Sequence, residues 1–166
     1  MLSPAIQDAI NRQVAHEFAS SYLYLSMSAY CESRSFDGFA HWFRVQSQEE
    51  YGHALRLFDM VLARGGQVTL QAIEAPQSDF ESLLDVMQRA LAHEQQVTAM
   101  IKEIYELAVK EEDYTTQAQL QWFLTEQVEE EKTAGAIADQ LKLIGSQGTG
   151  LFVLDRELAG RTAAGA

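Results

Sequence analysis

The sequence predicts an all-α fold: a four-helix bundle with one long crossover connection and a short C-terminal fifth helix. First, apolar residues recur at alternating steps of three and four along four long segments, which is the spacing of a helix face buried in a bundle. Second, the chain has only two prolines, so long stretches are free to be helical. Third, 47% of the 166 residues are hydrophobic, enough for one substantial core. We therefore expect a single domain over residues 1–166.

The first two helices are expected over residues 4–34 and 39–64. Ser3 is a favourable N-cap for the first, and Pro4 suits the first helical position because its missing N–H has no helical partner there. The second should end at Gly65, since glycine readily adopts the left-handed conformation that terminates helices.

Three further helices are expected over residues 79–111, 115–144 and, as a short tail helix, 148–159. Ser78 and Glu81 fit a capping box at the start of the third helix, with Ser78 accepting from the backbone ahead and Glu81 reaching back. Capping therefore places the start of the third helix at residue 79.

A twelve-residue connection, residues 66–77, joins the second and third helices. Extended, it reaches about 40 Å, while a helix of the second segment's length is about 39 Å long. The connection can therefore cross the whole bundle, which lets the second and third helices run parallel. Residues 163–166 are expected to be frayed.

Charge and cysteine content exclude several classes of protein. The net charge is −12, from 24 acidic and 12 basic residues, so the surface repels nucleic-acid phosphates and attracts cations. The single cysteine, Cys31, cannot form an internal disulfide, which favours a cytoplasmic location. No leader pattern or apolar run of membrane-spanning length is visible, so we expect no membrane partner. The negative charge likewise leads us to expect no nucleic-acid partner.

The buried stripe of each long helix is interrupted near its middle by a polar residue. These interruptions are Glu17, Glu50, Glu94 and Gln127. Because each lies within about a turn of mid-helix, they meet at one level of the bundle whichever way the helices run. The sequence therefore predicts a polar layer across the core.

The spacing of this layer repeats between the two halves of the chain. Glu17 and Glu50 are separated by 33 residues, as are Glu94 and Gln127, and His53 and Glu130 each follow three residues later. The pattern indicates two related helical hairpins.

Carboxylates converging in an apolar core need a neutralising partner, since burying each charge costs several kcal/mol. Protonation of some of them is one solution. Two divalent cations are another, because they balance four glutamates in formal charge while His53 supplies a neutral nitrogen. Oxygen-rich ligation with one imidazole suits iron or manganese better than structural zinc, although zinc can compete. We expect a paired metal site that holds iron or manganese, with iron the metal that the family resemblance below implies.

At these residues the sequence resembles the non-haem bacterial ferritins, over all four helices and the short tail. The segments that carry the resemblance are residues 17–24 (EFASSYLY), 48–54 (QEEYGHA), 64–66 (RGG) and 126–132 (EQVEEEK). Bacterioferritins and many di-iron oxidases have Glu-x-x-His where this chain has Gln127-x-x-Glu130, which points to ferritin proper. The resemblance implies a ferritin-like bundle in a cytoplasmic cage of 24 identical subunits that oxidises Fe(II) with O2 and stores ferric mineral.

The resemblance also assigns residues. It implies a first iron held by Glu17, Glu50 and His53, a second held by Glu50, Glu94 and Glu130, and a Gln127 that orients the second site. A third iron would match Glu49, Glu126, Glu129 and Glu130, and Tyr24 matches a tyrosine that supplies an electron when O2 is reduced. Bacterioferritins carry a haem-ligating methionine at the position of Gly52, so haem is not expected.

Simpler interpretations stand beside several of these assignments. Glu49, Glu126 and Glu129 also fit a solvated acidic face, and Tyr24 also fits a packing residue with a hydrogen-bonded hydroxyl. His16 and His93 lie off the buried stripes and are expected at a surface or interface. Apolar residues on more than one face of the first helix favour self-association.

Two other functions remain open from the sequence. One is a di-iron oxidase or peroxidase of the same fold that stores nothing. The other is a metal-stabilised helical binding module without catalysis.

Overall fold

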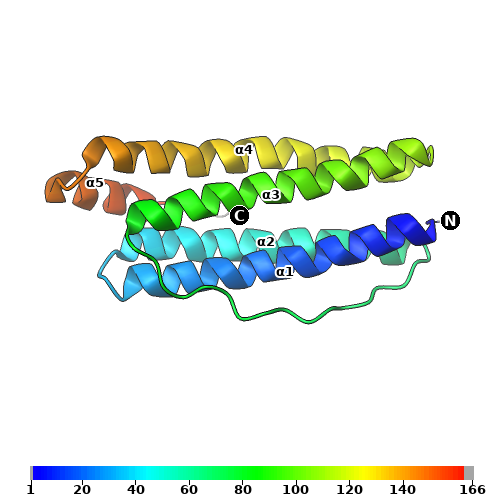
Figure 1. Ribbon diagram of the computed structural model, residues 1–166, viewed down its shortest axis with the longest axis horizontal. Helices are drawn as coiled ribbons and strands as arrows, with labels where there is room; N and C mark the ends of the chain where they lie inside the picture. The colour runs from blue at the N-terminus through cyan, green and yellow to red at the C-terminus, as the bar shows by residue number, and fades with distance from the viewer. Residues whose placement is uncertain (1, 163–166) are drawn as a thin grey trace.

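The computed structural model describes residues 2–162 and is a bundle of four long helices with a fifth, shorter helix at one end (Figure 1). The elements are α1 (Pro4–Glu32), α2 (Asp37–Ala63), α3 (Leu83–Lys110), α4 (Tyr114–Ile144) and α5 (Gly148–Leu158). The predicted class, an all-α bundle with a crossover and a short fifth helix, is confirmed. The predicted fraying of residues 163–166 lies outside the described part of the chain.

The four long helices form two antiparallel hairpins, α1 with α2 and α3 with α4. The connection between α2 and α3 runs the length of the bundle along α1, so that α2 and α3 point the same way (Figure 1). This is the crossover predicted from the length of the segment. None of the helices within residues 2–162 is long and apolar enough to cross a membrane.

Most helix ends follow from local capping. Ser3 Oγ accepts a hydrogen bond from the Ile6 amide at 3.2 Å, as the sequence predicted. Gly65 and Gly145 have φ angles of +71° and +57° and end α2 and α4, a conformation that costs glycine little. α1 ends at Glu32, two residues before the predicted limit.

The predicted start of α3 is wrong by four residues. Ser82, not Ser78, is the N-cap, and its Oγ accepts from the Asp85 amide at 3.1 Å. Phe80 is buried ahead of the helix, where its ring packs edge-on against Tyr30 with centroids 5.1 Å apart. This contact holds residues 79–82 outside the helix, so the capping box that the sequence suggested at Ser78 is not formed.

α2 begins at Asp37, two residues before the predicted start, and receives its N-cap from another part of the chain. Phe36 provides no side-chain cap. Instead, Asp155 of α5 accepts a hydrogen bond from the Phe39 amide at 3.0 Å. α5 approaches so closely that a Cβ at Gly38 would lie 1.6 Å from the Asp155 carbonyl oxygen, so only glycine fits there. The short fifth helix is thus fixed against the beginning of α2.

The apolar core is divided into two clusters. One contains Tyr24, Phe39 and Phe43 and extends to α5, and the other contains Ile10, Leu57 and other residues toward the opposite end of the bundle. The polar layer lies between them.

Candidate metal centre

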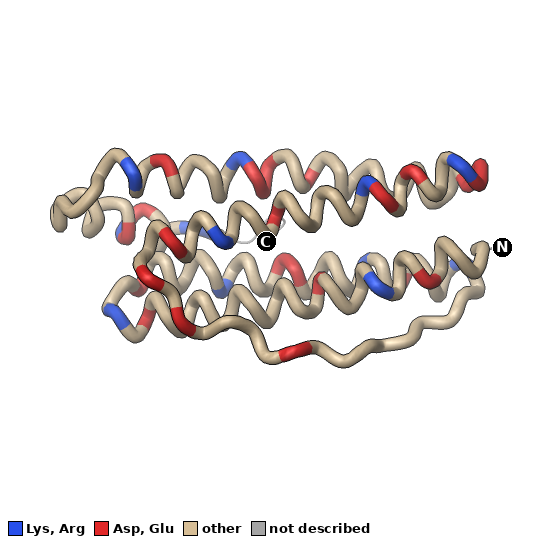
Figure 2. Tube along the Cα trace, in the orientation of Figure 1, with Lys and Arg blue, Asp and Glu red and all other residues tan. Residues whose placement is uncertain are grey.

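The predicted polar layer is present at mid-bundle and is buried. The exposed fractions are Glu17 0%, Glu50 1%, His53 7%, Glu94 1%, Gln127 2% and Glu130 6%. Figure 2 shows acidic positions near the middle of each long helix. The structure therefore brings together at one level the six residues that the resemblance assigned to a two-iron site.

Glu17, Glu50 and His53 form the most compact group in the layer. Each offers one ligand atom, and these atoms lie within 4.8 Å of one another. The step of three residues along α2 places His53 Nδ1 3.5 Å from Glu50 Oε2. The His53 ring packs edge-on against Trp122 and Phe123, at centroid distances of 5.3 and 5.9 Å, which fixes its orientation.

Two carboxylate oxygens of this group accept no hydrogen bond within the described structure, Glu17 Oε2 and Glu50 Oε2. A buried oxygen without a donor is costly, and a cation satisfies two such oxygens at once. The donor set of two carboxylates and one imidazole suits iron or manganese. This triad, which we call the first-half triad, is therefore chemically suited to hold a divalent ion.

The carboxylates of the second hairpin already have partners within the protein. Glu94 accepts from the Tyr24 hydroxyl and, at 3.0 Å, from Gln127 Nε2, which also donates to the Glu94 carbonyl at 3.1 Å. Glu130 accepts from Gln46 Nε2 at 2.6 Å. An ion at this half must compete with these hydrogen bonds.

Burial raises the pKa of all four core carboxyls. For Glu17 and Glu50 the pKa is raised well above its usual value, first by burial and then by the nearby charges of Glu50 and Glu94 respectively. Burial and the charge of Glu94 raise the pKa of Glu130 to about 7. In the metal-free protein the layer therefore retains protons, which bound cations would displace.

Tyr24 packs in the core and also contacts the polar layer through its hydroxyl. Its ring is 1% exposed and stacks on Phe43 with centroids 5.9 Å apart, while its hydroxyl donates to Glu94. Burial and the Glu94 charge raise its pKa well above the usual value. It is a core residue that touches the polar layer, and its redox role stays a prediction.

The structure brings the residues assigned to a third iron only partly together. Glu126 is half-buried and lines a surface hollow of about 740 Å³ with Glu49 and His53. Glu129 is exposed and pairs with Lys132 at 3.2 Å. Glu49 pairs with Arg161, whose Nη2 lies 2.5 Å from Glu49 Oε2. Among the described residues, only the first-half triad groups three metal-binding side chains within one ion's reach.

Two glutamines in contact with the layer received no role from the sequence. Gln13 Nε2 donates to Glu17 Oε1 at 2.8 Å, and Gln46 donates to Glu130 and, at 3.4 Å, to Glu50. Each lies four residues before a core glutamate, and the two are themselves 33 residues apart. The repeat spacing that identified the glutamates could have identified these amides as well.

His16 and His93 are not simple surface residues. Their rings stack with centroids 5.2 Å apart, beneath the crossover, and His93 Nε2 lies 2.7 Å from Ser20 Oγ. Burial and the proximity of His16 lower the pKa of His93 to about 4. The pair is neutral near pH 7.

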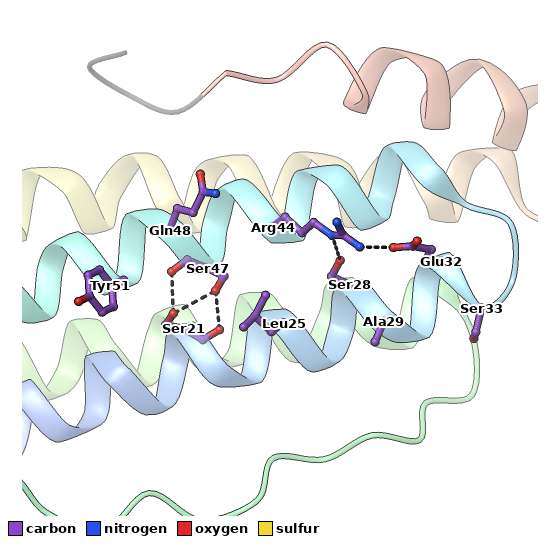
Figure 3. Close-up of a pocket in the computed structure, with 10 residues that line it drawn as sticks. All are labelled: Ser21, Leu25, Ser28, Ala29, Glu32, Ser33, Arg44, Ser47, Gln48 and Tyr51. Carbon is purple, nitrogen blue, oxygen red and sulfur yellow. Dashed lines mark hydrogen bonds and ion pairs between the residues drawn. The ribbon is translucent and has the colours of Figure 1, made fainter.

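A groove of about 710 Å³ opens between α1 and α2 on the surface of the bundle (Figure 3). Ser21 and Ser47 bridge the two helices at its floor, with 3.0 Å between their hydroxyls. Leu25 and Tyr51 are about half exposed beside it. The groove contains none of the core carboxylates and is an exposed, partly apolar surface.

Glycine at position 52 has no explanation in the structure. A Cβ there would meet nothing within 4 Å.

Comparison with known proteins gives one consistent result. Residues 7–144 match the family model for a ferritin-like domain. The chain is 38% identical to a bacterial non-heme ferritin of Staphylococcus haemolyticus (98% of each chain). It is 41% identical to one of Bacteroides fragilis, covering 97% of this chain and all of the relative.

Solved structures agree with this result. An engineered closed form of the Archaeoglobus fulgidus ferritin is 44% identical, with a TM-score of 0.97, over 99% of this chain and 100% of that one. A structure described as a novel open pore ferritin from the same archaeon is 44% identical, with a TM-score of 0.97, over 98% and 99%.

Proposed function

This chain belongs to the ferritin family, and from that premise we propose that it stores iron and oxidises Fe(II) with O2 at the polar layer of each subunit. The observation that carries the proposal is the first-half triad, in which two buried carboxylate oxygens accept no hydrogen bond and an imidazole lies beside them. A polar layer of this kind destabilises a bundle unless protons or cations neutralise it.

The residues of the polar layer bind two Fe(II) ions, which are the substrates. Glu17, Glu50 and His53 bind the first ion, and Glu50, Glu94 and Glu130 bind the second. Gln127 holds Glu94 through its side-chain amide at 3.0 Å and thereby orients the second position. Two Fe(II) ions each give one electron, and with two protons they reduce O2 to hydrogen peroxide. The protein fixes the distance between the ions and excludes other chemistry.

The protonated state of the metal-free layer supports this chemistry. Because the pKa of Glu130 is raised to about 7, binding of Fe(II) near neutral pH releases protons. The first-half triad contributes in the same direction, since burial also raises the pKa of Glu17 and Glu50.

We further propose assembly into a cage of 24 subunits with ferric mineral inside. Large apolar side chains remain exposed on a single subunit: Tyr22, Leu25, Tyr51, Val128, Leu143, Phe152 and Val153. Those around the groove between α1 and α2 (Figure 3) supply a surface that a second subunit can cover. The cytoplasmic location expected from the single cysteine stays a prediction.

The test is aerobic addition of Fe(II) to the metal-free protein, followed by absorbance of ferric iron and by electron microscopy. We expect oxidation well above the protein-free rate and hollow shells that fill with electron-dense mineral. Oxidation at the protein-free rate would contradict the ferroxidase proposal. Oxidation by a small oligomer without shells would favour the oxidase alternative over storage.

A further inference from the structure

The side chain of Arg161, just beyond α5, is held at the edge of the polar layer. Its Nη2 lies 2.5 Å from Glu49 Oε2, and the two side chains are only 19% and 11% exposed. The guanidinium lies over the Trp42 ring, 4.5 Å from its centroid, and Nη1 donates to the Trp42 carbonyl at 3.4 Å. An arginine with a carboxylate, a carbonyl and an aromatic face as partners is a fixed cation rather than a mobile surface charge.

The backbone around Arg161 is fixed as well. Upstream, Asp155 caps the first turn of α2 and Gly38 permits close contact with α5. At Arg161 itself, the carbonyl oxygen lies 2.8 Å from His41 Nε2. α5 and the segment after it are therefore each attached to α2, and these attachments direct the guanidinium toward Glu49.

Glu49 is the point where the tail meets the polar layer. It precedes Glu50 in the chain, and it lines the same surface hollow as His53 and Glu126. Glu130 is close to the same stretch of α2, because Gln46, three residues before Glu49, donates to Glu130 at 2.6 Å. A divalent ion bound between Glu49 and Glu130 would therefore lie beside the guanidinium, which repels it and already binds Glu49.

We infer that Arg161 occupies, as a built-in cation, the place at which a third divalent ion would bind Glu49. Each subunit then binds two ions while the tail is docked, and a third only when the Arg161 charge is removed. The inference rests on the proposed function, because it assumes that the first-half triad and the second-hairpin carboxylates bind ions. The Arg161 guanidinium neutralises the Glu49 carboxylate, so this carboxylate needs no metal ion to balance its charge.

The alternative is that Arg161 only anchors the tail and has no effect on metal binding. Stoichiometry separates the two. We would titrate the assembled, metal-free protein with Fe(II) without oxygen, count the ions bound per subunit by calorimetry, and locate them by anomalous diffraction from Fe(II)-soaked crystals. The expected count is two for the unchanged protein and three for Arg161→Ala, with the added ion at Glu49.

Three further variants make the result specific. Arg161→Gln keeps much of the side-chain length and the hydrogen-bonding capacity while losing the charge, so it should also bind three ions even if alanine disturbs the tail. Arg161→Ala combined with Glu49→Gln should return to two. Arg156→Ala removes the same charge from α5, where the guanidinium faces the exposed Phe152, and should stay at two.

The outcomes are distinguishable. Three ions in the unchanged protein, or two in both Arg161 variants, overturn the inference and leave the proposed function standing. Binding of no ion by any of these proteins overturns the proposed function, and the inference falls with it.

Discussion

The two helical hairpins contribute equivalent positions to the polar layer, but the layer is in a different state on each side. On the α1–α2 side, Glu17 and Glu50 each keep one oxygen without a hydrogen bond, and His53 lies beside them. On the α3–α4 side, Glu94 and Glu130 accept hydrogen bonds from Tyr24, Gln127 and Gln46. One half is arranged for a cation, and the other is already satisfied by protein donors.

This difference predicts an order of binding. An ion at the first-half triad gains two free oxygens, whereas an ion at Glu94 and Glu130 must replace existing hydrogen bonds. The two irons that we propose should therefore differ in affinity, with the tighter one on the α1–α2 side. The second hairpin has Gln127-x-x-Glu130 at the positions where the first hairpin has Glu50-x-x-His53. This difference in ligands contributes to the same asymmetry.

The strongest test compares Glu17→Gln with Glu94→Gln. Removing the Glu17 charge should weaken the tighter ion by more than about 100-fold, above the usual effect of outer partners. Glu94→Gln should change that ion by less than the roughly 10-fold effect of an outer partner and weaken mainly the second. Anaerobic Fe(II) titration measures both, with circular dichroism to verify that each variant is folded. Loss of the tighter ion in Glu94→Gln would reverse the assignment of the halves.

A smaller effect is expected from the two glutamines that hold the carboxylates. Gln46→Leu removes the donor to Glu130 and should weaken the second ion by about 10-fold, the scale of an outer hydrogen-bond partner. Gln13→Leu, its matched counterpart, removes the donor to Glu17 and should weaken the first ion instead. Anaerobic Fe(II) titration measures the effect of each variant on each ion. If both variants weakened the same ion equally, the two metal positions would not be independent.

The smallest effect is on the stability of the metal-free protein. The folded-state pKa of Glu130 is about 7, above its ordinary value of 4.5, so the folded protein holds this proton more tightly than the unfolded chain. Its contribution to stability is complete below about pH 4.5 and is lost as the pH rises through 7. The melting temperature should fall by a few degrees between pH 5 and pH 8.

Glu130→Gln is the control for that measurement, because glutamine does not titrate. Its melting temperature should fall less over the same range, and saturating Fe(II) without oxygen should reverse the trend in the unchanged protein. Parallel curves for the two proteins would show that groups other than Glu130 set the pH dependence.

Much of the fold could be predicted because it depends on local patterns. Apolar periodicity locates four long helices, and mid-helix polar interruptions place Glu17 and its counterparts at one level. The start of α3 could not be predicted, because Ser78 and Ser82 each precede an acidic residue by three positions. The choice of Ser82 depends on the packing of Phe80 on Tyr30, and a contact between distant segments leaves no periodic signal.

The same limit applies to the centre. Glu50 and His53 could be grouped from spacing alone, since they share one helix face, and Glu17 could be placed at their level, but its assignment to the same ion comes from the family resemblance. The pairing of Glu49 with Arg161 joins residues 112 positions apart and involves a tail with no repeat counterpart. Only the docking of α5 against α2 reveals it.

The crossover between α2 and α3 has a consequence for how the subunit stays together. It tethers two hairpins that would otherwise meet by diffusion, so their effective concentration is on the order of millimolar for a flexible linker. Leu70 and Ile73 are exposed along this connection, which makes it accessible to proteases on a single subunit. In a nicked subunit the ions that we propose would cross-link two separate peptides. A chelator that removed the ions would then speed the dissociation of the two hairpins. The ions that we propose would thus add a link between the two hairpins to the apolar core that already joins them.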